Sequence, residues 1–150
     1  MNGRPPVVVI AGIGNPFRRD DGVGIAVVRR LRGRVPRGVS LSEHSGEGAA
    51  LIEVWNGAET AILVDAVQSG APAGTIHRLN AALEVVPRGW FHCSTHAFGV
   101  AEAIEVARAL GGLPPRLFVI GIEGKDFSAG VGLSAEVEQA AAALVNEWLQ

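Results

Sequence analysis

Apolar and polar residues alternate along this chain in a pattern that predicts successive strands and helices. Short apolar runs bounded by glycine, proline or polar residues predict five strands, at Val7–Ala11, Val39–Glu43, Thr60–Asp65, Thr75–Leu79 and Arg116–Ile122. Apolar residues spaced three to four positions apart predict helices at about Gly22–Leu31, Ala49–Trp55, Phe98–Leu110 and Ala135–Leu149. Strands that alternate with helices indicate an α/β protein.

The strands Val7–Ala11 and Leu117–Ile120 are almost entirely apolar, which is typical of a parallel sheet covered on both faces. We therefore expect a single domain over residues 1–150, a three-layer α/β/α sandwich with a mostly parallel, twisted sheet of about five strands. Thr75–Leu79 follows a turn rich in glycine and proline, so we expect it to be an antiparallel edge strand. Ser134 is a candidate N-cap of the last helix.

Composition narrows the class of protein. A chain of 150 residues with 48% hydrophobic residues can build a core without metal or disulfides, and the lone Cys93 has no partner. Apolar stretches stay well short of the ~20 residues of a membrane span, and the first residues do not resemble a signal peptide. We expect a soluble, cytoplasmic protein. The net charge of −2 gives no attraction to nucleic acid, and the arginines of residues 29–37 suit a solvated helix end.

The segment Gly12–Gly24 carries two adjacent acids, Asp20 and Asp21, between a buried strand and a helix. Open α/β sheets bind ligands at this place, the carboxyl end of a central strand. The dinucleotide-binding fingerprint is a rival interpretation, but Phe17 replaces its third glycine and the two acids would repel a pyrophosphate. A structural interpretation is also open, in which Asp20 is the helix N-cap and Asp21 complements the helix dipole.

Two later residues complete a candidate site. Asp65 ends an apolar run, where a buried carboxylate needs a partner or a metal, although it can also cap a neighbouring loop. His96 precedes the third helix, where the dipole favours the neutral imidazole that a metal requires; capping or packing is the alternative role. Parallel strands gather such loops at one edge, and Asp21, Asp65 and His96 would form an open set of ligands for nickel or zinc.

The sequence resembles the hydrogenase maturation proteases, endopeptidases that trim the large subunit of nickel-iron hydrogenases. The specific part of the resemblance is the string Gly-Asn-x-x-x-x-Asp-Asp-Gly-x-Gly of residues 14–24. Supporting motifs are Leu63-Val-Asp-Ala-Val67, Ser94-Thr-His-Ala-Phe-Gly-Val100, Val119-Ile-Gly-Ile122 and Gly132-Leu-Ser134. The resemblance implies a sheet of about five strands between helices, and it places metal-binding and catalytic roles on Asp21, Asp65 and His96, with Asp20 as an alternative at the first position.

The resemblance also implies a function. The chain would remove the C-terminal extension of a nickel-iron hydrogenase large-subunit precursor after nickel insertion, acting as a monomer on nickel that the precursor itself carries. Activated water would come from the metal or from a carboxylate acting as general base. The alternative is a non-catalytic nickel-sensing chaperone or binding module for the same partner. Arg18 and Arg19 either contact that partner or are simply solvated.

Other reactive residues are not assigned to the site. The chain has no His-Glu-x-x-His string, and His92 and Cys93 lack a visible third group for a cysteine protease. Neither Glu43 nor His44 is assigned as a ligand, and His77 is expected to be a surface side chain of its strand.

Overall fold

Five strands form one sheet in the order β2-β1-β3-β5-β4, in a computed structural model that describes residues 7–91 and 98–150. The strands are β1 (Val8–Ile13), β2 (Val39–His44), β3 (Thr60–Val67), β4 (Ile76–Asn80) and β5 (Arg116–Glu123). The first three and β5 pair in parallel, and β4 pairs antiparallel with β5 at the edge. The predicted strand directions, including that of the edge strand, are confirmed.

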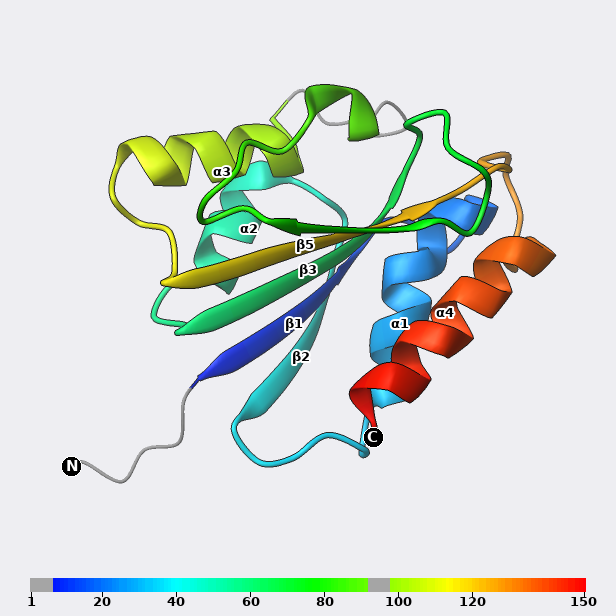
Figure 1. Ribbon diagram of the computed structural model, residues 1–150, viewed down its shortest axis with the longest axis horizontal. Helices are drawn as coiled ribbons and strands as arrows, with labels where there is room; N and C mark the ends of the chain where they lie inside the picture. The colour runs from blue at the N-terminus through cyan, green and yellow to red at the C-terminus, as the bar shows by residue number, and fades with distance from the viewer. Residues whose placement is uncertain (1–6, 92–97) are drawn as a thin grey trace.

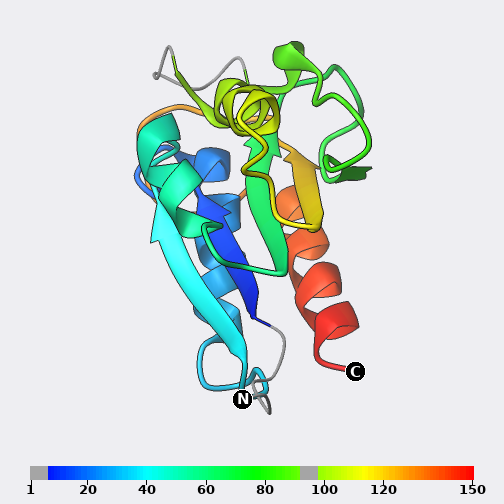
Figure 2. The ribbon, with the colours of Figure 1, turned by 90° about the vertical axis from the view of Figure 1, so that its left-hand side faces the viewer.

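Two pairs of helices cover the two faces of the sheet (Figure 1). The helices are α1 (Val23–Leu31), α2 (Gly48–Val54), α3 (Val100–Ala109) and α4 (Ala135–Trp148). Helices α1 and α4 pack side by side against one face, and α2 and α3 cover the other (Figures 1 and 2). This is the predicted three-layer arrangement. Two short 3₁₀ helices, η1 (Arg19–Gly22) and η2 (Arg88–Phe91), were not predicted.

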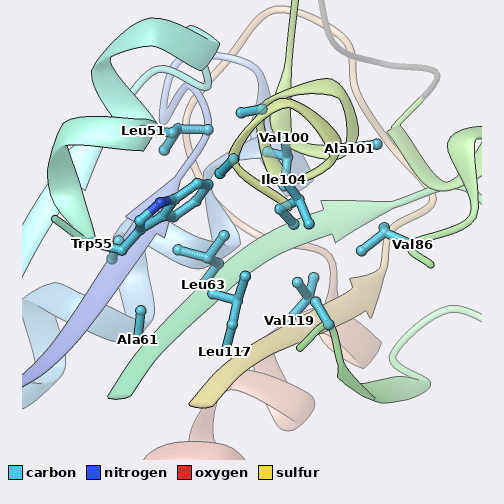
Figure 3. Packing of buried hydrophobic residues seen from close by; sticks show 14 of the residues in the cluster. Leu51, Trp55, Ala61, Leu63, Val86, Val100, Ala101, Ile104, Leu117 and Val119 are labelled. Carbon is cyan, nitrogen blue, oxygen red and sulfur yellow. The ribbon is translucent and has the colours of Figure 1, made fainter. Parts of the chain in front are cut away.

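Successive strand residues point to opposite faces of the sheet and so belong to two separate hydrophobic clusters. Leu63 of β3 and Val119 of β5 face α2 and α3, where they pack against Trp55 and Ile104 (Figure 3). Their neighbours Val64 and Ile120 face the opposite side and pack with α1 and α4. Because both faces are buried, the strands are apolar at successive positions, as the sequence indicated.

The strands extend further at their carboxyl ends than predicted. β1 continues to Ile13 and β3 to Val67, because Gly12 fits within the parallel ladder and Ala66 and Val67 remain buried. Asp65 therefore lies inside β3, two residues before its end, and not at the end of the strand.

Side-chain capping differs between helices α4 and α2. Ser134 occupies the predicted N-cap position of α4, but its side chain makes no capping bond to that helix. At α2 the N-cap is Glu47, whose carboxylate accepts hydrogen bonds from the amides of Ala49 at 3.0 Å and Ala50 at 3.1 Å. No helix in the described ranges is long and apolar enough to cross a bilayer.

Replacing Leu63 with Ala tests the burial of β3. Leu63 has no exposed surface, so we expect the free energy of unfolding to fall by about 2–5 kcal/mol in urea titrations. Ile62, its partly exposed neighbour, is the matched control, and Ile62→Ala should cost less. A larger loss for Ile62→Ala than for Leu63→Ala would contradict this assignment of the buried faces.

Candidate active site at the carboxyl edge of the sheet

Glycines let the loop between β1 and α1 pass close to the sheet. Gly14 has φ +139°, a conformation that side chains disfavour, and a Cβ there would collide with the carbonyl of Asp21. A Cβ on Gly24 would collide with the carbonyl of Val64, so only glycine lets the first turn of α1 lie directly against β3. The glycines thus bring the acids of residues 20 and 21 to the ends of the central strands.

Asp20 joins this loop to the segment between β5 and α4. Its side chain is fully buried, and Oδ2 accepts hydrogen bonds from the amides of Lys125 and Asp126, both at 3.0 Å. Ser134 adds its amide to Oδ1 at 2.8 Å and its hydroxyl to Oδ2 at 2.9 Å. Burial alone would raise the pKa of Asp20, but these four donors lower it below its ordinary value. The predicted N-cap role is wrong, because Gly22 caps α1 and Asp20 lies in η1.

Asp21 is also buried, with 7% of its surface exposed. Its Oδ2 accepts a hydrogen bond from the amide of Asn15 at 3.0 Å, and Nη1 of Arg18 lies 4.0 Å away. The bond to Asn15 closes the loop on itself and fixes the direction of the carboxylate. Asp20 is therefore committed to the fold, and Asp21 is the acid of this pair that remains a candidate for chemistry.

Asp65 lies on β3 between two residues that face α1 and α4, so its side chain points to the side of α2 and α3. Oδ1 accepts a hydrogen bond from the amide of Ala66 at 2.8 Å. Burial raises the pKa of Asp65 well above its ordinary value, and the negative charge of Asp21 raises it further. The structure thus brings Asp21 and Asp65 close enough to repel each other, and a cation between them would relieve that repulsion.

The third predicted ligand, His96, lies outside the described residues, as do His92 and Cys93. Within the ranges 7–91 and 98–150, no three His, Cys, Asp or Glu side chains are grouped so that they can hold a metal ion. The three-residue metal site therefore stays a prediction, supported at two of its three positions by the proximity of the carboxylates.

A second polar cluster at the same edge of the sheet was not predicted. Glu123 is 3% exposed, and its carboxylate accepts hydrogen bonds from the Ser69 amide at 2.9 Å and the Ser69 hydroxyl at 2.6 Å. Nε2 of His77 lies 3.1 Å from Oε1 of Glu123, and the His77 ring packs 5.1 Å from that of Trp90. The surface role expected for His77 is wrong. The sequence does contain a sign of this cluster. Glu123 is an acid that directly follows the apolar run 117–122, as Asp65 follows the apolar run 61–64.

The arginines near the site are engaged in ion pairs. Arg29 and Arg32 both bond to Glu43 at 3.0 Å, and Arg30 forms two bonds to Glu138. Within the basic run of residues 29–37, Arg29, Arg30 and Arg32 thus pair with acids of neighbouring elements.

His44 lies at the end of β2, with its Nε2 atom 2.9 Å from the Ser42 hydroxyl. Burial lowers the pKa of this histidine.

Comparison with known proteins links this geometry to one family. The sequence profile of the family described as hydrogenase maturation protease matches residues 25–150. The hydrogenase expression/formation protein HupM of Azotobacter chroococcum mcd 1 is 32% identical over 127 residues, which are 82% of this chain and 60% of that protein. This chain spans 54% to 60% of the length of three such curated relatives.

Solved structures share the fold. The crystal structure of a hydrogenase 2 maturation peptidase from a Thaumarchaeota archaeon is 27% identical, with a TM-score of 0.69 and 95% of each chain covered. The hydrogenase maturating endopeptidase HybD of Escherichia coli has a TM-score of 0.75 at 21% identity, with 94% of this chain and 88% of that chain covered. At that identity the second likeness shows the fold alone.

Replacing Asp20 with Asn should destabilise the protein, because all four partners of the carboxylate are donors and an amide would present a fifth donor to them. We expect a loss of about 2–5 kcal/mol in urea titrations at pH 7. The depressed pKa of Asp20 stabilises the fold above its unfolded value of about 3.9, and that contribution disappears as pH falls through the folded pKa. Asp20→Asn should therefore lose less stability than the native chain on acidification. Equal stability at pH 7 would contradict this role.

Replacing Asp65 with Asn should instead stabilise the metal-free protein at neutral pH. Because the pKa of Asp65 is higher in the folded state than in the unfolded state, the folded state loses stability as pH rises from the unfolded-state pKa towards the folded-state pKa. Asn keeps the acceptor for the Ala66 amide without an ionisable group. A gain of 1 kcal/mol would raise Tm by about 2–4 °C, which calorimetry resolves. The gain should vanish below about pH 4, where both forms of residue 65 are neutral. A lower Tm for Asp65→Asn at pH 7 would contradict the assignment.

Proposed function

This chain belongs to the hydrogenase maturation protease family, and we propose that it is an endopeptidase that removes the C-terminal extension of a nickel-iron hydrogenase large-subunit precursor. The observation that supports the proposal is the pair of buried carboxylates at one edge of the sheet, Asp21 from the loop after β1 and Asp65 from β3. An incoming cation would relieve their mutual repulsion.

We propose that the cation is nickel carried by the precursor. Asp21 and Asp65 would bind it through carboxylate oxygens, with His96 as the third ligand. Two carboxylates and one imidazole are a donor set that nickel accepts, and they leave positions for groups of the precursor. Because binding requires deprotonated ligands, the raised pKa of Asp65 makes protons compete with the metal and weakens the binding of metal alone.

Cleavage then requires a water molecule placed against the scissile carbonyl and a group that accepts its proton. A carboxylate of the pair is placed to serve as that base. Burial and the negative charge of Asp21 raise the pKa of Asp65, which makes Asp65 a stronger base than an ordinary aspartate. The buried surroundings limit access of bulk water to the carboxylates.

We also propose a cytoplasmic location and a monomeric enzyme. The single cysteine supports the first of these, because the chain alone offers no disulfide that an oxidising compartment would maintain. Analytical ultracentrifugation tests the second: a single species at the chain's mass of 15.6 kDa is expected, and a dimer would contradict it.

The proposal is tested by mixing the metal-free protein with precursor prepared with and without nickel, and following the C-terminal extension by mass spectrometry. We expect cleavage of the nickel-loaded precursor only, because the precursor completes the coordination shell. The His96→Ala variant should fold, as judged by circular dichroism, yet leave the precursor intact. Arg37→Ala, an exposed change at the opposite end of β2, is the control and should cleave normally.

Three outcomes of this experiment would contradict parts of the proposal. Equal cleavage of both precursors would refute the mechanism that uses the precursor's nickel. Full activity of folded His96→Ala would remove His96 from the site. Binding of the nickel-loaded precursor without cleavage would favour the non-catalytic nickel-sensing module.

A further inference from the structure

Asp65 has neighbours in the sheet that the proposed mechanism does not use. It pairs with Gly121 of β5, and Gly121 pairs in turn with His77 of β4. Paired residues on neighbouring strands direct their side chains to the same face of a sheet, and such strands lie about 4.8 Å apart. Asp65 and His77 therefore flank Gly121 on the face that α2 and α3 cover.

Val67 and the indole ring of Trp90 fill the space that Gly121 leaves. A Cβ atom at position 121 would lie 2.7 Å from a methyl group of Val67 and 3.5 Å from Cε3 of Trp90. Trp90 belongs to η2 and packs against the cluster on the side of α2 and α3, to which Asp65 also points. The indole ring thus lies on the sheet beside Asp65, and Trp90 remains partly exposed.

Backbone and side-chain contacts hold Trp90 in this place. The amide of Gln68 donates to the carbonyl of Trp90 at 2.8 Å, which ties η2 to the end of β3. The indole ring packs against the ring of His77, with centroids 5.1 Å apart and planes tilted by 39°. η2 also contacts α3, on the same side of the sheet (Figure 1). The indole is therefore fixed before any substrate arrives.

Glu123 in turn holds the ring of His77. Nε2 of His77 lies 3.1 Å from Oε1 of the buried Glu123. The Glu123 carboxylate also accepts hydrogen bonds from the Ser69 hydroxyl at 2.6 Å, the Ser69 amide at 2.9 Å and the Gly70 amide at 3.3 Å. A buried carboxylate bonded by several groups keeps one orientation. The contacts that begin at Ser69 thus pass through Glu123 and His77 and end at Trp90.

This arrangement gives the candidate site an apolar wall on the side of β5 and β4. The indole of Trp90 is large, rigid and partly exposed, so it offers apolar contact area at a low cost in conformational entropy. An extended peptide advances about 3.3 Å per residue, which is less than the spacing of two strands. A peptide whose scissile bond is held at Asp65 therefore places a nearby residue against Trp90 when it runs towards β5.

We propose that Trp90 is a substrate-contacting residue that binds an apolar group of the precursor within about two residues of the scissile bond, and that Glu123 and His77 position its indole ring. This inference rests on the proposed function, because it takes the precursor as the substrate. A contact with a fixed indole stabilises the bound precursor before and during cleavage alike. Its loss therefore acts on KM more than on kcat.

The test measures KM and kcat of Trp90→Ala and Trp90→Phe with nickel-loaded precursor. The matched control is Trp148→Ala, because Trp148 is also a partly exposed tryptophan but packs on the side of α1 and α4. Circular dichroism and urea titrations measure the folding and stability of each variant. If Trp90→Ala does not fold, Trp90→Leu replaces it, because leucine keeps apolar volume over Gly121 without the indole plane.

We expect Trp90→Ala to raise KM roughly tenfold while kcat changes by less than about threefold. Trp90→Phe keeps an aromatic ring over Gly121, so its KM should stay within about threefold of the native value. Trp148→Ala should lower the stability of the protein but leave KM unchanged.

The positioning role is tested by His77→Ala and His77→Gln, since glutamine keeps a donor for Glu123. Arg78→Gln is the control, an exposed change at the next residue of β4, where Arg78 bonds to Glu147 of α4. The emission of Trp90 is the difference between each variant's spectrum and that of the same variant carrying Trp90→Phe. We expect His77→Ala to shift this emission to longer wavelength and to raise KM. His77→Gln should do both to a smaller extent, and Arg78→Gln should do neither.

An unchanged KM in the folded Trp90→Ala or Trp90→Leu variant would overturn the inference and assign Trp90 to the fold alone. An equal rise of KM in Trp148→Ala would also overturn it. Unchanged emission and KM in folded His77→Ala would remove the positioning role of Glu123 and His77.

Failure of the proposed function looks different, because the native protein would then leave nickel-loaded precursor intact. Titration calorimetry with the same precursor decides the inference in that case. A weaker affinity of Trp90→Ala than of the native chain would support the contact at Trp90, and equal affinities would overturn it.

Discussion

The buried carboxylate of Asp20 is the interaction on which the arrangement of this edge of the sheet depends. It connects the loop after β1 to the segment after β5, two regions more than 100 residues apart in sequence, by accepting three hydrogen bonds at Oδ2 and one at Oδ1. The same bonds keep Asp20 ionised although it is fully buried. Backbone hydrogen bonds between Arg19 and Gly130 and between Asp20 and Asp126 reinforce the same connection.

Buried acids at one end of this sheet have opposite electrostatic environments. Donors surround Asp20 and Glu123, and their pKa values are lowered despite burial. Burial raises the pKa of Asp65 and the nearby carboxylate of Asp21 raises it further, whereas the hydrogen bond from the amide of Ala66 opposes this shift. The first two acids are satisfied by the fold, whereas Asp65 is held at a cost in stability. A group retained at such a cost is a candidate for function, because a structural role alone would favour a neutral residue.

The sequence pattern predicted the elements well because the helices and strands are long and their apolar residues face a core on a regular period. Contacts between residues that are far apart in the sequence were not predicted. Asp20 looked like an N-cap because its partners lie 105 to 114 residues away, and no local pattern reveals them. His77 looked like a solvated surface residue of an edge strand, yet it is half-buried because it bonds to Glu123, 46 residues later in the sequence. Asp65 was recognised because an acid in an apolar strand is improbable whatever its partners are.

Two adjacent acids serve this loop because consecutive residues of a 3₁₀ helix point about 120° apart. Asp20 turns towards the segment before α4 and uses its whole carboxylate to hold the loop in place. Asp21 is thereby directed away from that segment and towards β3, where its charge acts on Asp65. A single acid at either position would have to anchor the loop or serve the site, but not both. The pair of aspartates therefore combines one anchor with one candidate for the chemistry of the site, and the first holds the loop that brings the second near Asp65.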